Sequence, residues 1–331
     1  MTTKRPASGA IKLPASIDIG SHSSLLLIAG WDIVEGKARL MPKVQKAEVI
    51  RLGEDLHNHG DISAERLAEL TNVLVGFRQT IHALGADLQS VVMTEAVRKC
   101  ANPDAVLSAV EKELWTKPRI IEGEEEARLS WAAVAHWHGV DQVTIDVGGG
   151  SSEISQGRDF ISIPMGALRL KNELGVIPGP EYKKWSKEAL SAIEFKPFAK
   201  KPVTLVGGTA VALAMVHLNL QKYDWQRLEG IELSIEDLNK TIQRICDLSK
   251  ELRSQLPGLE HGRAEVIICG LFWIRSLLEK LKVEQFRIST LGLRFGALLP
   301  SEILQQLFPA PPEPTKRGFK AKAVAIEEIE N

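Results

Sequence analysis

Apolar residues recur along this chain in short runs separated by polar or glycine-containing breaks. Residues 16–19 and 24–29 are rich in β-forming side chains, and the polar turn between them indicates two directly joined strands. Further short strands are expected up to residues 49–50. Similar runs predict later strands at residues 90–94, 119–121, 142–146, 160–163 and 203–206.

Helices are indicated where apolar side chains recur every three or four residues. Ser63 is a suitable N-cap for a helix whose apolar stripe runs from Leu67 to Ile81. Asn102 and Pro103 have the residue types of an N-cap and a first helical position, so a second helix is expected there. Strands, helices and hairpins in this order indicate an α/β fold with mixed sheets. Further helices are predicted near residues 123–134, 207–215, 234–252, 264–282 and 293–307.

The chain of 331 residues is long enough for two domains with sizeable cores. We expect the first domain to span residues 15–137 and the second to span residues 138–308. Residues 1–14 are expected to form a flexible N-terminal segment. Four prolines between residues 309 and 314 exclude a helix interior, so a Pro-rich and then charged, mobile tail is expected over 309–331.

The overall charge and the cysteine pattern exclude several classes of partner. The formal net charge is −1, so no basic field is available to recruit nucleic acid or an anionic membrane surface. The 3 cysteines are widely scattered and fit neither a disulfide framework nor a paired-cysteine metal site. No apolar run is long enough to cross a bilayer or to act as a signal segment. We therefore expect a cytoplasmic protein that binds neither nucleic acid nor membrane.

One short motif occurs twice. Residues 17–24 read Ile-Asp-Ile-Gly-Ser-His-Ser-Ser, and residues 145–152 read Ile-Asp-Val-Gly-Gly-Gly-Ser-Ser. Each copy places an acidic residue at a strand end and follows it with a turn rich in N–H and hydroxyl donors, which suits a phosphate with a metal ion. Either turn alone also fits a polar hairpin turn without a ligand. Two copies in one chain indicate two similar domains that hold a phosphate chain between them.

The second copy contains more candidate ligand-binding residues than the first. Three consecutive glycines at residues 148–150 lose much backbone entropy on folding and suit a loop that a ligand approaches closely. Asp146 and Glu153 are candidate ligands of Mg²⁺, directly or through water. A third loop, at residues 206–209, follows a strand and opens a helix, so its N–H groups can face an anion.

Two further features are candidates for catalysis. Arg98 follows the strand predicted at 90–94, at an edge where α/β folds bind ligands, and a guanidinium can hold phosphate with two hydrogen bonds. An exposed helix arginine is the alternative interpretation. Glu124, Glu125 and Glu126 lie in the first turn of a predicted helix, where carboxylates also interact favourably with the helix dipole. One of them is a candidate general base facing a cleft.

Together these motifs resemble the exopolyphosphatase and guanosine pentaphosphate phosphohydrolase family, Ppx/GppA, of the actin, Hsp70 and sugar-kinase superfamily. The resemblance runs in order from about residue 15 to 300, and the glutamate-rich segment and the second glycine loop are its most specific parts. The matching stretches are residues 17–23, 52–56, 94–98, 121–129, 145–153, 164–169, 206–210, 263–264 and 289–294.

The resemblance implies two actin-like (ribonuclease H-like) domains with mixed β-sheets flanked by helices and the active site in the cleft between them. It implies removal of the terminal phosphate from inorganic polyphosphate, or of the 5′ γ-phosphate from pppGpp, with Mg²⁺ or another divalent cation. Glu126 matches the catalytic glutamate and Arg98 the family arginine, and Asp146, Gly148, Ser151 and Glu153 match functional positions of the second loop. We expect Asp146 and Glu153 to hold the metal, with Asp18 as a further ligand through water. A homodimer is expected by analogy. The expected phosphate-binding residues are Ser21, His22, Ser23, Gly148, Gly149, Gly150, Ser151, Gly207, Gly208 and Thr209.

Two positions depart from the family pattern. His22 stands where the family usually has asparagine, and Phe295 stands where it often has glutamate. They motivate a second hypothesis, a catalytically weak sensor that binds (p)ppGpp or polyphosphate. A third hypothesis is a small-molecule kinase of the same superfamily, against which the glutamate-rich segment argues. The sequence leaves the choice between polyphosphate and pppGpp open.

Overall fold

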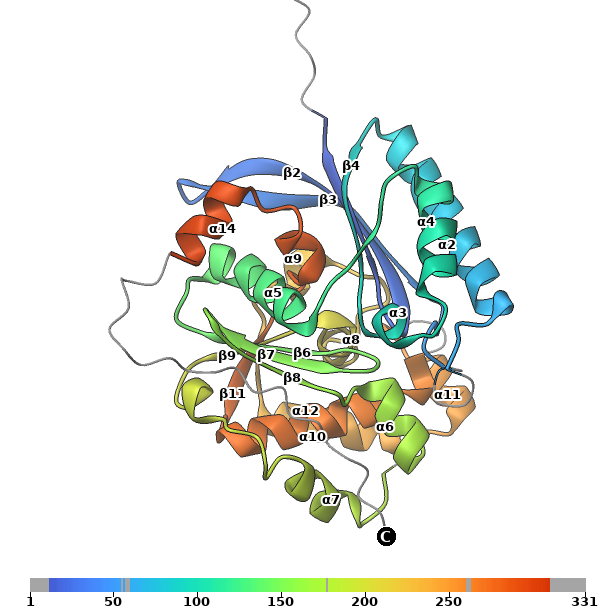
Figure 1. Ribbon diagram of the computed structural model, residues 1–331. Helices are drawn as coiled ribbons and strands as arrows, with labels where there is room; N and C mark the ends of the chain where they lie inside the picture. The colour runs from blue at the N-terminus through green and yellow to red at the C-terminus, as the bar shows by residue number, and fades with distance from the viewer. Residues whose placement is uncertain (1–11, 55, 57–59, 177, 260–262, 310–331) are drawn as a thin grey trace, which may run out of the picture.

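The computed structural model describes residues 12–54, 56, 60–176, 178–259 and 263–309 (Figure 1). These residues form two β-sheets, each flanked by helices. The flexible segment expected at residues 1–14 and the tail expected at residues 309–331 lie almost wholly outside the described residues. None of the described helices is both long enough and apolar enough to cross a membrane.

The first sheet has five strands in the order β3-β2-β1-β4-β5. β2 pairs antiparallel with both β1 and β3, whereas β4 runs parallel to β1 and β5 runs parallel to β4. Glu35 and Gly36 form the turn between β2 and β3, and both have positive φ angles, which suits the twist of a tight hairpin. The strands are β1 (Pro14–Ile19), β2 (Ser23–Val34), β3 (Lys37–Val49), β4 (Asp87–Met93) and β5 (Arg119–Ile120).

The second sheet has six strands in the order β10-β11-β9-β6-β7-β8. β6, β7 and β8 are consecutive antiparallel neighbours, while β9 runs parallel to β6 and β11 runs parallel to β9. β10 is antiparallel to β11 at the edge of the sheet. The strands are β6 (Val143–Val147), β7 (Ser152–Gln156), β8 (Asp159–Ile163), β9 (Val203–Val206), β10 (Glu232–Ser234) and β11 (Gln285–Ile288).

The two sheets repeat one topology. β1, β2, β3 and β4 have the same neighbours and relative directions as β6, β7, β8 and β9. In the first turn, the Gly20 N–H donates to the Ser23 carbonyl at 3.0 Å, and in the second the Gly148 N–H donates to the Ser151 carbonyl at 3.0 Å. The repeated sequence motif therefore folds into the same hairpin twice.

Helices α2 and α4 pack beside each other on the first sheet (Figure 1). Ser63 caps α2 as predicted, because its hydroxyl accepts a hydrogen bond from the Arg66 N–H at 3.3 Å. Asn102 holds the N-cap position of α4, but its side-chain amide instead bonds the backbone of Ile62 at 3.0 and 2.9 Å. The helices of the first half are α2 (Ala64–Ala83), α3 (Glu95–Lys99), α4 (Pro103–Leu114) and α5 (Gly123–His138).

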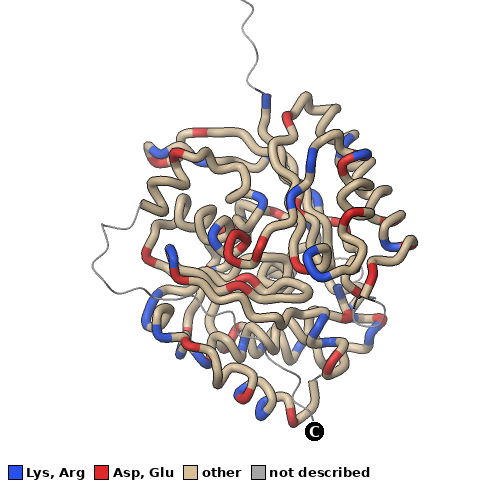
Figure 2. The backbone as a smooth tube through the Cα atoms, viewed as in Figure 1, with Lys and Arg blue, Asp and Glu red and all other residues tan. Residues whose placement is uncertain are grey.

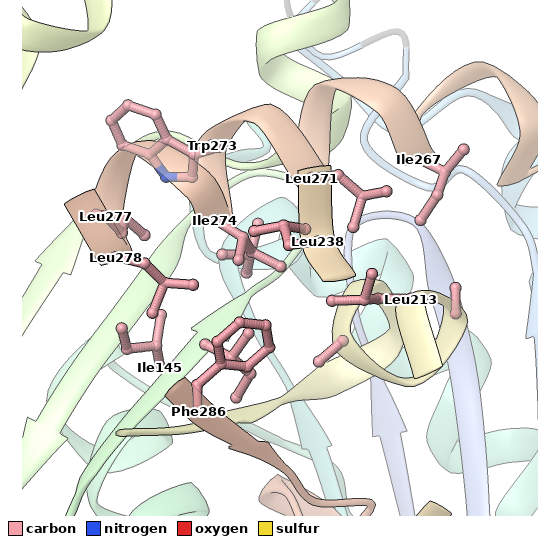
Figure 3. Close-up of a cluster of buried hydrophobic side chains, with 14 of the residues drawn as sticks. Ile145, Leu213, Leu238, Ile267, Leu271, Trp273, Ile274, Leu277, Leu278 and Phe286 are labelled. Atoms are coloured by element: carbon pink, nitrogen blue, oxygen red, sulfur yellow. The ribbon is translucent and has the colours of Figure 1, made fainter. Parts of the chain in front are cut away.

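The largest apolar core lies between the second sheet and the helices α8, α10 and α12. Figure 3 shows Leu213 of α8, Leu238 of α10 and Ile274 of α12 gathered near Ile145 and Phe286 of the sheet, and all five are at most 2% exposed. Burial of such side chains is the main favourable contribution to folding. The helices here are α6 (Ala167–Leu174), α7 (Tyr182–Ala189), α8 (Gly207–His217), α9 (Trp225–Leu228), α10 (Ile235–Cys246), α11 (Lys250–Ser254), α12 (Ile267–Leu281), α13 (Leu293–Gly296) and α14 (Ser301–Leu307), with the 3₁₀ turns η1 (Lys196–Phe198) and η2 (Arg263–Glu265).

Two of the predicted helices are too long. The helix that Ser234 caps ends at Cys246 rather than reaching Leu252, because Ser249 starts a new helix by accepting a hydrogen bond from the Leu252 N–H at 3.3 Å. The helix predicted over 293–307 is divided into α13 and α14, and Pro300 immediately precedes the second. Both breaks occur where a local residue favours a helix start over continuation. The strands β10 and β11 and the helices α3, α6, α7 and α9 were not predicted.

Helix α5 joins the two halves. It packs on β6, β7 and β8 and also contacts α13. Gly296 of α13 lies against the Leu129 carbonyl of α5, where there is no room for a side chain. Phe295 is 2% exposed and belongs to an apolar cluster formed by residues of β2, β3, α5 and α13. Phe295, which departs from the family pattern, therefore makes a buried apolar contact between the halves.

Candidate active site

The two repeated turns meet around a cavity of about 100 Å³ between the halves. The turns approach so closely that a Cβ at Gly149 would lie 3.1 Å from the Cβ of His22. The start of α8 completes the wall. All of the residues predicted to bind phosphate line this cavity, namely Ser21, His22, Ser23, Gly148, Gly149, Gly150, Ser151, Gly207, Gly208 and Thr209.

The second glycine turn is held in place by the start of α6. The Ala167 N–H donates to the Gly148 carbonyl at 2.9 Å, and the Leu168 N–H donates to the Gly149 carbonyl at 2.9 Å. Gly166 lies against the same turn, where a Cβ would meet the Gly149 carbonyl at 2.6 Å. The turn is therefore fixed before any ligand arrives, which lowers the entropy lost on binding.

Three carboxylates lie where this cavity joins a second one of about 330 Å³. Asp18 at the end of β1, Asp146 at the end of β6 and Glu126 in α5 line both cavities. Figure 2 shows acidic positions gathered where the start of α5 meets the β6–β7 hairpin. Glu153 is not among the residues that line these two cavities. It lies opposite Asp146 on the paired strand, and its carboxylate accepts a hydrogen bond from Ser162 Oγ at 3.0 Å.

Burial makes these carboxyl groups weaker acids than usual. It raises the pKa of Asp18 to about 7, although the positive charge of Arg294 opposes the shift. Burial alone raises the pKa of Asp146 to about 6. Burial, followed by the charge of Asp146, raises the pKa of Glu153 to about 8. The cluster therefore takes up protons near neutral pH unless positive charge enters the cavity.

Of the three glutamates that begin α5, only Glu126 lines the cavities. Glu124 is exposed, and Glu125 pairs with Arg119 at 2.9 Å. The Oε2 atom of Glu126 is enclosed and has no hydrogen-bond partner among the described residues. Burial, then the charges of Glu153, Asp18 and Asp146, raise its pKa well above the usual range, and Arg98 opposes this shift. These properties suit a general base.

Arg98 acts on this site from outside the cavity wall. Its Nη1 donates to the Ile121 carbonyl at 2.5 Å, and its Nε lies 3.7 Å from the Glu122 carboxylate. It is not among the described residues that line the two cavities. Its positive charge nevertheless lowers the pKa values of Glu126 and Glu153.

Arg263 lines both cavities, although the sequence motifs assigned it no role. It is 8% exposed, and its guanidinium lies over Gly208 and donates to Ser23 Oγ at 3.3 Å. Arg294 also lines the larger cavity and donates to the side chain of Gln45 at 3.3 Å. Both arginines lie within stretches that match the family, and this match is the sequence feature that could have identified them as site residues.

His22 is the residue of the first turn that departs from the family pattern. The residue is 6% exposed, and neither ring nitrogen has a hydrogen-bond partner among the described residues. Burial, and then the positive charges of Arg263, Arg51 and Lys171, lower its pKa to about 3. The ring is therefore neutral at physiological pH, with both nitrogens available to a ligand.

The carboxylates fit a divalent cation whose ligands come partly from the protein and partly from a substrate. The Oδ1 atom of Asp18 is enclosed without a hydrogen-bond partner in the described structure. Within the described residues, no group of three or more His, Cys, Asp or Glu side chains is arranged to hold a metal ion by itself. Mg²⁺ usually binds through one or two carboxylates together with water and substrate phosphates. Asp18 and Asp146 fit that mode of binding.

Comparisons with known proteins show which family the chain is similar to. The model of the Ppx/GppA phosphatase family matches residues 32–304. Exopolyphosphatase 1 of Mycobacterium tuberculosis is 27% identical over 304 residues, which cover 86% of this chain and 86% of that protein. Exopolyphosphatase 1 of Mycobacterium leprae is 26% identical over 300 residues, which cover 86% of this chain and 87% of that protein.

Solved structures show the same architecture. The crystal structure of the Aquifex aeolicus family member has a TM-score of 0.70 and 28% identity, and the match covers 89% of this chain and 98% of that chain. An exopolyphosphatase from Cytophaga hutchinsonii has a TM-score of 0.76 and 22% identity over 89% of this chain and 98% of that chain. The fold consists of two actin-like domains with mixed sheets flanked by helices. Because the family model matches most of its length, the chain belongs to the Ppx/GppA phosphatase family.

Proposed function

We propose that this phosphatase removes the terminal phosphate of inorganic polyphosphate. Water attacks the terminal phosphorus, the phosphoanhydride bond to the next phosphate breaks, and inorganic phosphate and a chain shorter by one phosphate leave. The observation that supports this reaction best is the enclosed, unpartnered carboxylate of Glu126 at the edge of a cavity lined by two glycine-serine turns. The names of the mycobacterial relatives support the same substrate.

Glu126 is the proposed general base. Its raised pKa makes its carboxylate a better proton acceptor than an ordinary glutamate, so it can take the proton of the attacking water. Arg263 and the N–H and hydroxyl groups of the two turns are placed to offset the charge of the phosphoryl oxygens. Arg98 contributes through its charge, which opposes the protonation of Glu126 before the reaction.

Asp18 and Asp146 are the residues that would hold Mg²⁺ or another divalent cation, with Glu153 behind Asp146. A bound cation would supply positive charge to the phosphate oxygens and to the carboxylates that burial otherwise protonates. The enclosed Oδ1 of Asp18 and the raised pKa values of Asp18 and Asp146 support this assignment.

The adjoining cavity supports pppGpp as a second candidate substrate. Its volume of about 330 Å³ lies within the range of about 300–1,000 Å³ that is typical of small-molecule sites. Apolar walls with a few polar groups suit a nucleoside whose phosphates reach the glycine-serine turns. The apolar lining includes Leu25, Ala47, Val211, Met215 and Leu259, and the polar lining includes Gln45, Tyr223 and Thr290.

A panel of substrates tests these proposals. Phosphate release is measured from polyphosphate, pppGpp and ATP, each with Mg²⁺ and with a chelator. We expect release from polyphosphate that requires the divalent cation, and release from pppGpp if the larger cavity accepts the nucleoside. Binding of polyphosphate or (p)ppGpp without turnover would favour the sensor, and transfer of phosphate from ATP to a small acceptor would favour the kinase.

A further inference from the structure

The cavity between the two turns is closed on one side by the carboxylate of Glu95. This residue begins α3 and is 8% exposed. Its Oε2 accepts a hydrogen bond from Ser21 Oγ at 3.2 Å in the first turn. It also lies against Gly150 in the second turn, where a Cβ would overlap the same oxygen. The carboxylate therefore fills the gap between the two turns.

A separate cavity of about 300 Å³ lies on the other side of Glu95. Lys99 and Arg169 line it, and the Lys99 Nζ contacts the Oε1 of Glu95 at 2.6 Å. The side chain of Lys99 is 47% exposed, so this side leads towards solvent. Both cavities share the wall formed by Ser21, Glu95, Gly149, Gly150 and Leu168.

The three carboxylates lie at the opposite end of the cavity of about 100 Å³ between the two turns, which we call the turn cavity. There it shares Asp18, Glu126 and Asp146 with the cavity of about 330 Å³. That cavity in turn shares Gln45 and Tyr223 with an outer groove of about 860 Å³. The order along the cleft is thus outer groove, larger cavity, carboxylates, glycine-serine turns and finally Glu95.

We propose that Glu95 is the end wall that restricts the hydrolysis proposed above to the last phosphate of a chain. This inference rests on that proposed function. A chain that enters past the carboxylates meets Glu95 at the far wall of the turn cavity, which at about 100 Å³ is smaller than the cavities of about 330 Å³ and about 300 Å³ on either side of it. The negative charge of Glu95 also disfavours a second phosphate there.

A role only in the ion pair with Lys99 is the competing interpretation. Pairs of this spacing on a helix surface contribute little to stability. The Glu95 side chain is only 10% exposed, and it is held by Ser21 as well as by Lys99. Removing it would join the turn cavity to the cavity of Lys99 and Arg169, and a chain could then pass through the site.

Polyphosphate with both terminal phosphates blocked by esterification tests the proposal, because such a chain has no free end. The wild-type protein is expected to release phosphate from free-ended chains and to leave blocked chains intact. Glu95→Ala is expected to cut blocked chains internally and to produce intermediate lengths on a gel. Lys99→Ala, which removes the ion pair and leaves the wall in place, is the matched control and is expected to leave blocked chains intact.

Retention of the strict need for a free end by an active Glu95→Ala variant would overturn the proposal. So would a folded Glu95→Ala variant that hydrolyses neither substrate, since an end wall is not part of the chemistry. If Glu95→Ala does not fold, Glu95→Asp, which shortens the wall by one methylene, is tested on the same two substrates with the same expected outcomes. A wild-type protein that fails on free-ended chains would instead refute the proposed function.

Discussion

Asp146 on β6 and Glu153 on β7 lie directly opposite each other, so two carboxylates share one face of the hairpin that carries the three consecutive glycines. Both are buried deeply enough for their pKa values to rise to about 6 and about 8. Burial therefore disfavours the ionised form of both carboxyl groups, and a bound cation would favour it.

This arrangement predicts an unusual pH dependence of stability. The pKa values of Asp18 and Glu153, about 7 and about 8, lie above their unfolded values of 3.8 and 4.5. Between pH 6.5 and 8.5 the folded protein therefore binds more protons than the unfolded chain, and the free energy of unfolding falls as pH rises. His22 opposes this only below pH 6.5, where its lowered pKa makes stability rise with pH.

Thermal unfolding in a chelator measures the effect. The melting temperature is expected to fall from pH 6.5 to pH 8.5, and Glu153→Gln is expected to flatten that fall. Mg²⁺ is expected to restore stability most at the higher pH. A melting temperature that does not change with pH in this window would contradict the assigned burial of the carboxyl groups.

Glu126→Gln is expected to abolish most phosphate release while preserving polyphosphate binding. The amide keeps the shape of the side chain but cannot accept the proton, and loss of a general base typically lowers the rate by about 10²–10⁴-fold. Quenched-flow assays and equilibrium binding check the two halves of the prediction. Glu124→Gln, in the same helical turn and exposed, is the control and is expected to behave as wild type.

Arg98→Gln is expected to move the acid limb of the pH–rate profile to higher pH. The charge of Arg98 lowers the pKa of Glu126, so its removal lets that pKa rise further. The profile of kcat/KM reports the shift in the free enzyme. Arg119→Gln, which removes an arginine paired with Glu125 at 2.9 Å, serves as control and should leave the profile unchanged.

His22→Asn is expected to reduce the number of protons taken up when phosphate binds at pH 6. In the free protein three nearby cations and burial keep the ring neutral, and a bound anion offsets those cations and offers its nitrogens an acceptor. Calorimetry of phosphate binding in two buffers of different ionisation enthalpy gives the proton count. His217→Asn, at an exposed position, is the control and is expected to take up as many protons as wild type. If His22→Asn also takes up as many protons as wild type, His22 is not protonated when phosphate binds.

Gly207→Ala is expected to destabilise the protein by more than about 1 kcal/mol. Gly207 has a φ of 82°, and a Cβ there would overlap the carboxylate of Asp146. Gly157→Ala is a matched control, because its φ of 62° is also positive but nothing lies within 4 Å of the added Cβ. Urea unfolding of the pair separates backbone strain from the collision, and equal losses would show that Asp146 is not held there.

Local sequence patterns predicted the repeated hairpins and most of the residues that line the cavity between the turns. A strand, a glycine turn and a second strand are specified by neighbouring residues, so the turn hydrogen bonds of Gly20 and Gly148 follow from the motif itself. The cap of α2 at Ser63 was predictable for the same reason, because donor and acceptor are three residues apart.

The tertiary structure decided which charged groups line the cavities. Glu124, Glu125 and Glu126 have nearly the same local sequence, and only the packing of α5 on the second sheet turns Glu126 into the cavity. Arg263 reaches Ser23 across 240 positions of sequence. Such contacts depend on how both halves pack together, whereas hairpins and caps depend on bonds within a few residues. The sequence alone therefore determined the turns, and the packing of the two sheets determined their chemistry.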